Sequence, residues 1–407
     1  WGYINQQDDA HWSLRPKPIQ VPGRVVELSA FYNNVYFART EDGKVYTWDA
    51  GLPSQVSLGD HSAVRLVLKN PRLDLQGRVY LYSYICMRDG TILKGQPHGQ
   101  NLRLDEVIEG PAQGMIDCGI GESRHHNWRA TYCALTPERQ LYCWGENAYG
   151  LVGNGTENPV EEPYRVPLDH VRDFAVGASQ VCALDGAHDL YCWGRAEPGG
   201  HVLASPLRIQ GVPRLGALWP AWRADTGAWL PRIGFDVDGN GKFTDFYQQD
   251  SYFGDDFSPV VRPRFFATWE HGTFFVIDET FRLWARGSDV LGKAGVGKAW
   301  RYEPVRVEGL VNASTLAPGA WHSCAWKASD GHVHCWGGHT TARHANTARG
   351  TAQTVRNGDP PTWVGEASAL ASGMLHSCLI DPDHNARCWG NGHVVDDAIR
   401  PEADWSP

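Results

Sequence analysis

The feature that most constrains the fold of this chain is a dipeptide of the Trp-Gly type that recurs about every 50 residues; we call each occurrence a mark. Eight such marks run along the sequence, at Trp1-Gly2, Trp48-Asp49, Lys94-Gly95, Trp144-Gly145, Trp193-Gly194, Trp284-Ala285, Trp336-Gly337 and Trp389-Gly390. Six of the seven intervals are close to one length, and the interval from Trp193 to Trp284 spans 91 residues. A fixed period of this size predicts a propeller or a solenoid.

Each interval repeats the same order of short segments. A Gly-rich turn such as 147–156 is followed by a Pro-x-x-Val strand, a small-residue strand ending in Gly, and two alternating strands. This order predicts an all-β fold with four antiparallel strands per period, and ring closure protects the strand edges. Seven intervals predict a seven-bladed β-propeller over residues 1–407. The segment at Trp1 is expected to complete the last blade.

Two units carry a resemblance to a known family. The unit from Cys133 to Val166 and the unit from Gly319 to Gly337 resemble the regulator of chromosome condensation repeat family, whose fold is a seven-bladed propeller. The Cys-plus-Cys-Trp-Gly variant resembles bacterial secreted members of that family. The nucleotide-exchange activity of the nuclear member is not carried over, because one fold supports many unrelated binding roles.

The ten cysteines predict disulfides rather than a metal or redox site. Eight of them stand in hairpin pairs, at Cys133/Cys143, Cys182/Cys192, Cys324/Cys335 and Cys378/Cys388. Facing Cβ atoms in a hairpin approach disulfide geometry, whereas zinc and redox sites favour Cys-x-x-Cys spacing. Cys86 and Cys118 remain, and they predict a bridge between neighbouring blades. Disulfides imply a secreted, periplasmic or cell-surface location.

Charge and composition narrow the classes of partner. The net charge of −9 argues against a nucleic-acid-binding surface. No stretch has the roughly 18 apolar residues of a membrane helix. Neither a nucleophile elbow nor a phosphate loop is evident, so we expect a protein that is not an enzyme. Paired histidines such as His322 and His376 in two His-Ser-Cys units suggest a scaffold role.

The long interval contains an expected insert, 220–263, whose sequence suggests calcium binding. Its acidic loop follows the start of the EF-hand pattern, with Asp236, Asp238 and Asn240 at alternate positions and Gly241 at the turn. Candidate Ca²⁺ ligands are therefore Asp236, Asp238, Asn240, the carbonyl of Lys242, and Asp245. Tyr247 stands where an EF-hand has its bidentate Glu, and the alternative is a Gly/Asn/Asp-rich hairpin turn. A second alternative makes this segment a degenerate eighth blade.

Three tryptophans in or beside the insert form a candidate binding surface: Trp219, Trp222 and Trp229. Their alternative role is the insert's own small core. The sequence as a whole predicts a rigid protein–protein interaction platform at a cell surface or in an extracellular assembly. Two alternatives stay open, a calcium-dependent carbohydrate-binding module and an enzyme with its site at the central channel.

Overall fold

The fold is known from a computed structural model. It describes residues 12–30, 36–48, 53–68, 72–73, 79–80, 82–98, 101–122, 129–195, 201–210, 215–223, 228–236, 240–242, 256–261, 263–269, 273–278, 280–288, 300–307, 310, 312–319, 322–327, 332–337, 353–354, 367–373 and 376–391. Within the described residues, no helix is long and apolar enough to cross a membrane.

The described residues contain seven antiparallel sheets of four strands, which we number as blades 1 to 7. The first four blades follow chain order from the centre outward, except that β7 and β8 interrupt blade 2. Blade 1 is β2 Val25–Ala30, β3 Tyr36–Thr40, β4 Val45–Trp48 and β5 Ser54–Gln55. Blade 2 is β6 Ala63–Leu68, β9 Ser83–Met87, β10 Ile92–His98 and β11 Asn101–Ile108. Blade 3 is β12 Asp117–Glu122, β13 Ala130–Leu135, β14 Leu141–Gly145 and β15 Val160–Arg165. Blade 4 is β16 Asp173–Val176, β17 Gln180–Leu184, β18 Leu190–Arg195 and β19 Val202–Arg208.

The last three blades repeat this arrangement, and blade 7 takes its outer strand from the start of the chain. Blade 5 is β24 Pro263–Trp269, β25 Thr273–Asp278, β26 Leu283–Ser288 and β27 Trp300–Arg306. Blade 6 is β28 Ala313–Pro318, β29 His322–Lys327, β30 His332–Gly337 and β31 Gln353–Thr354. Blade 7 is β32 Ala369–Ser372, β33 His376–Ile380, β34 Ala386–Asn391 and β1 Trp12–Ile19.

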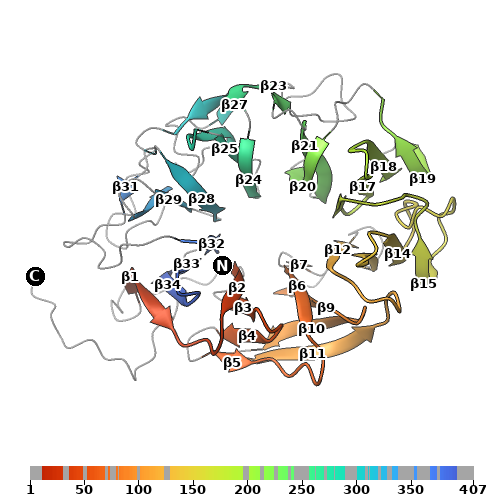
Figure 1. The fold of residues 1–407 in the computed structure, drawn as a ribbon, viewed down its shortest axis with the longest axis horizontal. Helices are drawn as coiled ribbons and strands as arrows, with labels where there is room; N and C mark the ends of the chain where they lie inside the picture. The colour runs from red at the N-terminus through yellow and green to blue at the C-terminus, as the bar shows by residue number, and fades with distance from the viewer. Residues whose placement is uncertain are drawn as a thin grey trace, which may run out of the picture.

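The blades stand around a common centre, with the first strand of each one innermost (Figure 1). These inner strands contact one another in sequence around the ring, in the order β2, β6, β12, β16, β20, β24, β28 and β32. The predicted β-propeller is therefore confirmed. Closure depends on the start of the chain, because Trp12–Ile19 pairs antiparallel with β34.

The segment between blades 4 and 5 lies in the ring itself. It contains two hairpins, β20 Leu215–Arg223 with β21 Ala228–Asp236, and β22 Asn240–Lys242 with β23 Asp256–Val261. We call these strands the β20–β23 unit. Its strand β20 contacts β16 on one side and β24 on the other, and Figure 1 shows the unit between the two blades. The unit thus takes the position of a blade, although its inner sheet has two strands. A further hairpin joins β7 Arg72–Leu73 to β8 Val79–Tyr80.

The turn between the second and third strands links four of the blades to the next unit of the ring by a backbone hydrogen bond. Its last residue has positive φ in six blades, at Gly43, Gly90, Arg139, His188, Phe281 and His384. This conformation disfavours side chains with a Cβ. In four blades the carbonyl of this residue accepts a backbone N–H from the start of the next blade. The donors are Ala63 to Gly43, Val171 to Arg139, Ala313 to Phe281 and Val25 to His384, at 2.9–3.0 Å. The last of these joins blade 7 to blade 1.

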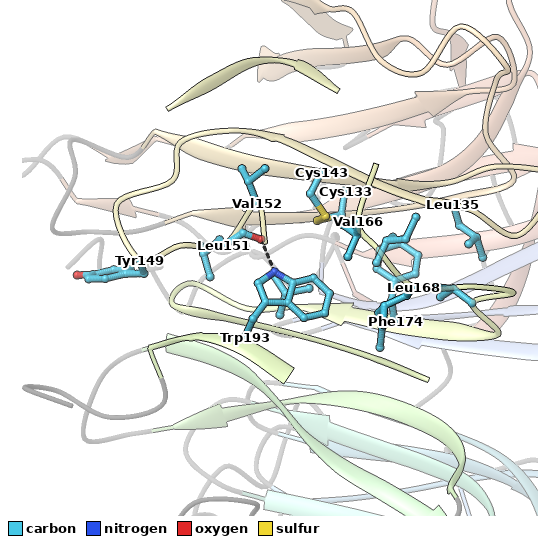
Figure 2. Close-up of a cluster of buried hydrophobic side chains, with 14 residues drawn as sticks. Cys133, Leu135, Cys143, Tyr149, Leu151, Val152, Val166, Leu168, Phe174 and Trp193 are labelled. Atoms are coloured by element: carbon cyan, nitrogen blue, oxygen red, sulfur yellow. Dashed lines mark hydrogen bonds between the residues drawn. A yellow bond between two sulfur atoms is a disulfide. The ribbon is translucent and has the colours of Figure 1, made fainter. Parts of the chain in front are cut away.

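The cores lie between blades, and each is built from opposite faces of two neighbours. At the interface of blades 3 and 4, Trp193 packs beside the Cys133–Cys143 disulfide, and both are fully buried (Figure 2). The indole Nε1 of Trp193 donates to the carbonyl of Leu151 at 2.7 Å. The same arrangement closes the ring, where Trp48 of blade 1 shares a core with the Cys378–Cys388 disulfide of blade 7. The disulfides therefore form part of the apolar packing between blades.

Candidate interaction site

All ten cysteines are paired in the structure, in the combinations that the repeat spacing predicts. Each of four disulfides joins two facing residues of its own hairpin, with Cα–Cα distances of 4.1–4.2 Å: Cys133–Cys143, Cys182–Cys192, Cys324–Cys335 and Cys378–Cys388. The fifth joins Cys86 of β9 to Cys118 of β12 at a Cα–Cα distance of 6.4 Å. That bridge links blades 2 and 3, as expected. Covalent links inside and between blades favour a rigid ring.

The register shows that the mark assigned to blade 5 was wrong. Gly287 pairs with Thr273 as Gly145 pairs with Thr131, so Arg286 takes the place of the mark tryptophan. Trp284 lies two residues earlier, and its Nε1 donates to the Asp278 carboxylate at 2.9 Å. The dipeptide Trp284-Ala285 resembles a mark in the sequence, but the strand pairing assigns that position to Arg286-Gly287.

The mark assigned to blade 2 was displaced by one residue for the same reason. In blades 1, 3 and 4 the mark tryptophan follows the positive-φ residue of the turn at a constant interval, as Trp144 follows Arg139. The same interval from Gly90 leads to Gly95 and not to Lys94. Blade 2 therefore has a glycine where its neighbours have a large ring, which the sequence pattern alone concealed.

The candidate calcium loop lies at the junction of the two hairpins in the β20–β23 unit. Asp236 is the last residue of β21, and Asn240 and Lys242 belong to β22. Asp238 and Asp245 lie outside the described residues. Two strands joined by a short connection bring Asp236 and Asn240 to its two ends, which fits a tight oxygen-rich loop. Among the described residues, no group of three or more His, Cys, Asp or Glu is arranged to hold a metal.

The three candidate binding tryptophans lie on the hairpin β20–β21. Trp222 and Trp229 are directly opposite each other in its ladder, next to the turn, and Trp219 stands opposite Ile233. The unit is anchored to blade 4 by Leu218, which is buried beside the Cys182–Cys192 disulfide. The backbone thus brings two of the three predicted tryptophans together at one end of a hairpin that packs into the ring.

The histidine in the first His-Ser-Cys unit has a structural position. His322 is buried, and its Nε2 lies 2.8 Å from Ser377 Oγ of the second such unit. Ser377 Oγ also lies 2.9 Å from Ser372 Oγ. This buried polar contact joins blades 6 and 7, in agreement with the scaffold role expected for these units.

One inner-strand position carries a run of charges that the sequence analysis missed. Glu27, Arg65, Asp117 and Asp173 occupy equivalent register positions on the inner strands of blades 1 to 4 respectively. Each stands opposite a residue at or next to the end of the second strand. We call these four residues the axial arc, because the inner strands surround the centre of the ring (Figure 1). The sequence held a signal for this position, since each of the four residues directly precedes the small-residue segment of its repeat. Only the register shows that the four positions are equivalent.

Ion pairs and backbone hydrogen bonds hold the axial arc. Arg39 Nε donates to Glu27 Oε2 at 2.7 Å, and Arg65 pairs with Asp117. Asp173 accepts backbone N–H groups from Phe174 and from Leu218 of the β20–β23 unit, both at 2.8 Å. Arg65 thus joins blade 2 to blade 3 and Asp173 joins blade 4 to the β20–β23 unit, whereas Glu27 pairs with Arg39 within blade 1.

The environment shifts the pKa values of two residues in the axial arc. Burial raises the pKa of Asp173 above its usual value, against the backbone donors that stabilise its carboxylate, and the charge of Asp117 raises it further. Burial acts to lower the pKa of Arg65, but the nearby carboxylates, led by Asp117, raise it overall. The Arg65 side chain is nevertheless 49% exposed. The arc is therefore a crowded set of charges that solvent reaches.

Comparisons with known proteins agree with this architecture. A model of the regulator of chromosome condensation (RCC1) repeat matches residues 140–184. Human E3 ubiquitin-protein ligase HERC2 is 26% identical over a region that covers 37% of this chain and 3% of that protein. The chain therefore spans a small part of this relative, whose activity belongs to a much longer protein.

Two solved structures are among those that this chain matches. The computationally designed Ika8 protein has a TM-score of 0.50 and 14% identity, covering 92% of this chain and 98% of its own. Prp20p from Saccharomyces cerevisiae has a TM-score of 0.47 and 13% identity, covering 92% and 83% respectively. At such identities the likeness concerns the fold alone. The chain is a β-propeller whose residues 140–184 match the regulator of chromosome condensation repeat, and it resembles that repeat family.

Proposed function

We propose that this chain is a rigid platform that binds a protein partner outside the cytoplasm. The observation that carries the proposal is the set of five disulfides, which join strands within blades and join blade 2 to blade 3. Disulfides persist in oxidising compartments, and a fixed scaffold presents loops and insertions for recognition at low entropic cost. The resemblance to the repeat family supports a binding role.

A thiol assay tests the compartment. Protein isolated from its native source under denaturing, non-reducing conditions is expected to show no thiol that reacts with Ellman's reagent. Recovery of free thiols at most of the ten cysteine positions would place the chain in a reducing compartment and remove this part of the proposal.

The partner is proposed to contact the β20–β23 unit. Here a position in the ring is filled by two hairpins and not by a four-stranded sheet, and Trp222 and Trp229 face each other in the first hairpin. Large aromatic side chains dominate the energetics of many protein interfaces. Deleting the insert 220–263 is a poor test, because it truncates β20, the strand whose Leu218 packs against blade 4.

Point variants give a sharper test of this contact. Photo-crosslinking on the native cell, followed by mass spectrometry, identifies the partner of the unaltered protein. The double variant Trp222→Ser with Trp229→Ser is expected to reduce that crosslink about tenfold or more. Tyr164→Ser, an exposed aromatic on the outer strand of blade 3, is the matched control. Equal crosslinking by the double variant, with an unchanged melting temperature, would exclude this contact.

The acidic loop is proposed to bind Ca²⁺ through Asp236, Asp238, Asn240, the Lys242 carbonyl and Asp245. The support is the oxygen-rich spacing of the loop in the sequence and the positions of Asp236 at the end of β21 and Asn240 at the start of β22. Tb³⁺ added to the full chain is expected to show luminescence sensitised by nearby tryptophans and displaced by Ca²⁺. Asp238→Asn should weaken it and Asp42→Asn should not, and a signal equal in both variants would refute the site.

A further inference from the structure

The register position that the axial arc occupies is charged in blades 1 to 4 and neutral in blades 5 to 7. In blades 5, 6 and 7, the residues at the same register position are Phe265, Thr315 and Ala369. Blades with these neutral residues contact their neighbours through the same inner strands. Ring closure therefore does not require charge at this position. The run from Glu27 to Asp173 calls for an explanation beyond the stability of the fold.

Counted together with Arg39, which pairs with Glu27, the arc has one unit more of negative charge than of positive charge. Glu27 is matched by Arg39 and Arg65 is matched by Asp117. The hydrogen bonds of Asp173 come from two backbone amides, so no guanidinium or ammonium is bonded to its carboxylate among the described residues. Asp117 and Asp173 occupy equivalent positions on adjacent inner strands, and the Asp117 side chain is 30% exposed. A cation between these two carboxylates would complete the pairing.

Aliphatic residues directly precede three of the four charged residues in the chain. Val26 precedes Glu27 and is 38% exposed, and Ile116 precedes Asp117 and is 37% exposed. Between them in the ring, Val64 precedes Arg65 and is partly buried. Such a mixture of aliphatic surface and charge is characteristic of protein interfaces, whereas a small free cation gains nothing from the aliphatic groups.

We propose that the axial arc binds an extended segment of a protein partner, with a lysine or arginine side chain between Asp117 and Asp173. An aliphatic residue next to that side chain would pack against Ile116. Charge complementarity carries the assignment, because Asp173 has no cationic side chain bonded to it among the described residues, and the carboxylate of Asp117 stands at the equivalent position of the adjacent strand. The inference rests on the proposed function as a protein-binding platform and names the chemistry of the segment that one of its surfaces accepts.

A labelled peptide tests the axial arc directly. The probe is a fluorescein-labelled leucine-lysine peptide, with leucine-glutamate and glycine-lysine peptides as comparators, and the readout is fluorescence anisotropy with the full chain. The variant Asp117→Asn with Asp173→Asn is expected to bind the leucine-lysine peptide about tenfold more weakly at low salt. The control Asp42→Asn with Asp89→Asn makes the same change in net charge on exposed turn residues, and should alter binding less than about twofold.

Two single variants keep the test decisive if the double variant fails to fold. Arg65→Gln frees Asp117 and is expected to tighten binding a few-fold, the opposite of what a loss of structure does. Ile116→Ala should weaken binding about threefold, and Val107→Ala, exposed on an outer strand, should not. Weaker binding by Arg65→Gln, equal losses in the arc and control variants, or equal binding of the glutamate peptide would overturn the inference.

The outcome is separable from that of the proposed function. One outcome is that the arc variants leave peptide binding unchanged while Trp222→Ser with Trp229→Ser still abolishes the native crosslink. In that case the proposed function is retained and the axial arc is not the binding surface. If the peptide fails and the native protein yields no specific crosslink either, both proposals are wrong.

Discussion

Blades 3 and 5 fill the same position in different ways. In blade 3, Cys133 and Cys143 are opposite each other and face Trp193 of blade 4. In blade 5, Phe275 and Ala285 occupy the same register position and face Trp336 of blade 6. The rings of Phe275 and Trp336 have centroids 6.0 Å apart at 71°. The interface therefore requires apolar volume at this point, and the disulfide supplies it together with a covalent link.

The turns of the two blades differ in a related way. In blade 3, Thr136 Oγ1 accepts the backbone N–H of Gln140 at 3.3 Å. In blade 5 the equivalent residue is Asp278, a buried carboxylate with donors from Thr280, Arg282 and Trp284 at 2.7–3.0 Å. Blade 5 lacks the disulfide but has the denser hydrogen-bond network. Substitutions at these positions test how far the two solutions are equivalent.

The largest effect is expected from Phe275→Ala. This substitution removes most of the volume that faces Trp336, and core Phe→Ala changes cost about 3–5 kcal/mol of unfolding free energy. Chemical denaturation of the full chain measures the loss. A loss below about 1 kcal/mol would mean that blades 5 and 6 are held together mainly by their backbones.

The double variant Cys133→Ala with Cys143→Ala should cost less. Opening the short loop returns about 2–3 kcal/mol of chain entropy to the unfolded state, while the smaller side chains leave a modest cavity. The same denaturation series provides the comparison with Phe275→Ala. If the cysteine variant proves the more damaging of the two, the covalent link and not the filled volume is what blade 3 requires.

Asp278→Asn should destabilise by about 2 kcal/mol at pH 7, because charge-assisted hydrogen bonds to a buried group are lost. Burial alone would raise the pKa of Asp278, but its donors, led by Trp284, lower it. Its contribution is complete above the ordinary Asp value of 3.8 and is lost as the pH falls through the folded pKa. The gap between variant and parent should therefore narrow in acid. Thr136→Ala should show a smaller, pH-independent loss, and parallel pH profiles for both variants would contradict this account.

The smallest effect separates two mark tryptophans. Trp193→Phe removes the hydrogen bond to the Leu151 carbonyl, whereas the buried Nε1 of Trp144 has no acceptor among the described residues. Trp193→Phe and Trp144→Phe remove similar volume, so Trp193→Phe should lower the free energy of unfolding by about 1 kcal/mol more than Trp144→Phe. Thermal melts of the two single variants measure the difference. Equal melting temperatures would show that the bond to Leu151 contributes nothing net.

Much of the architecture was predictable because its signals are local. The hairpin cysteines lie a few residues apart on facing strands, so spacing alone predicted their four bridges. The buried mark residues Trp48, Trp144, Trp193 and Trp336 were predictable as core anchors for the same reason. The errors came where a local imitation competed with the true register, as at Trp284 and Lys94. A one- or two-residue displacement is invisible in a letter pattern, but it moves a side chain along or across the sheet.

The sequence by itself determined the repeating blade, the paired cysteines and the break in the repeat after Trp193. Those features follow from strand alternation and turn chemistry within about 50 residues. Only the tertiary structure decided that β20 takes a place in the inner ring and that Glu27, Arg65, Asp117 and Asp173 share one position. These residues lie far apart along the chain, and the closed ring alone brings the first strands of successive blades side by side.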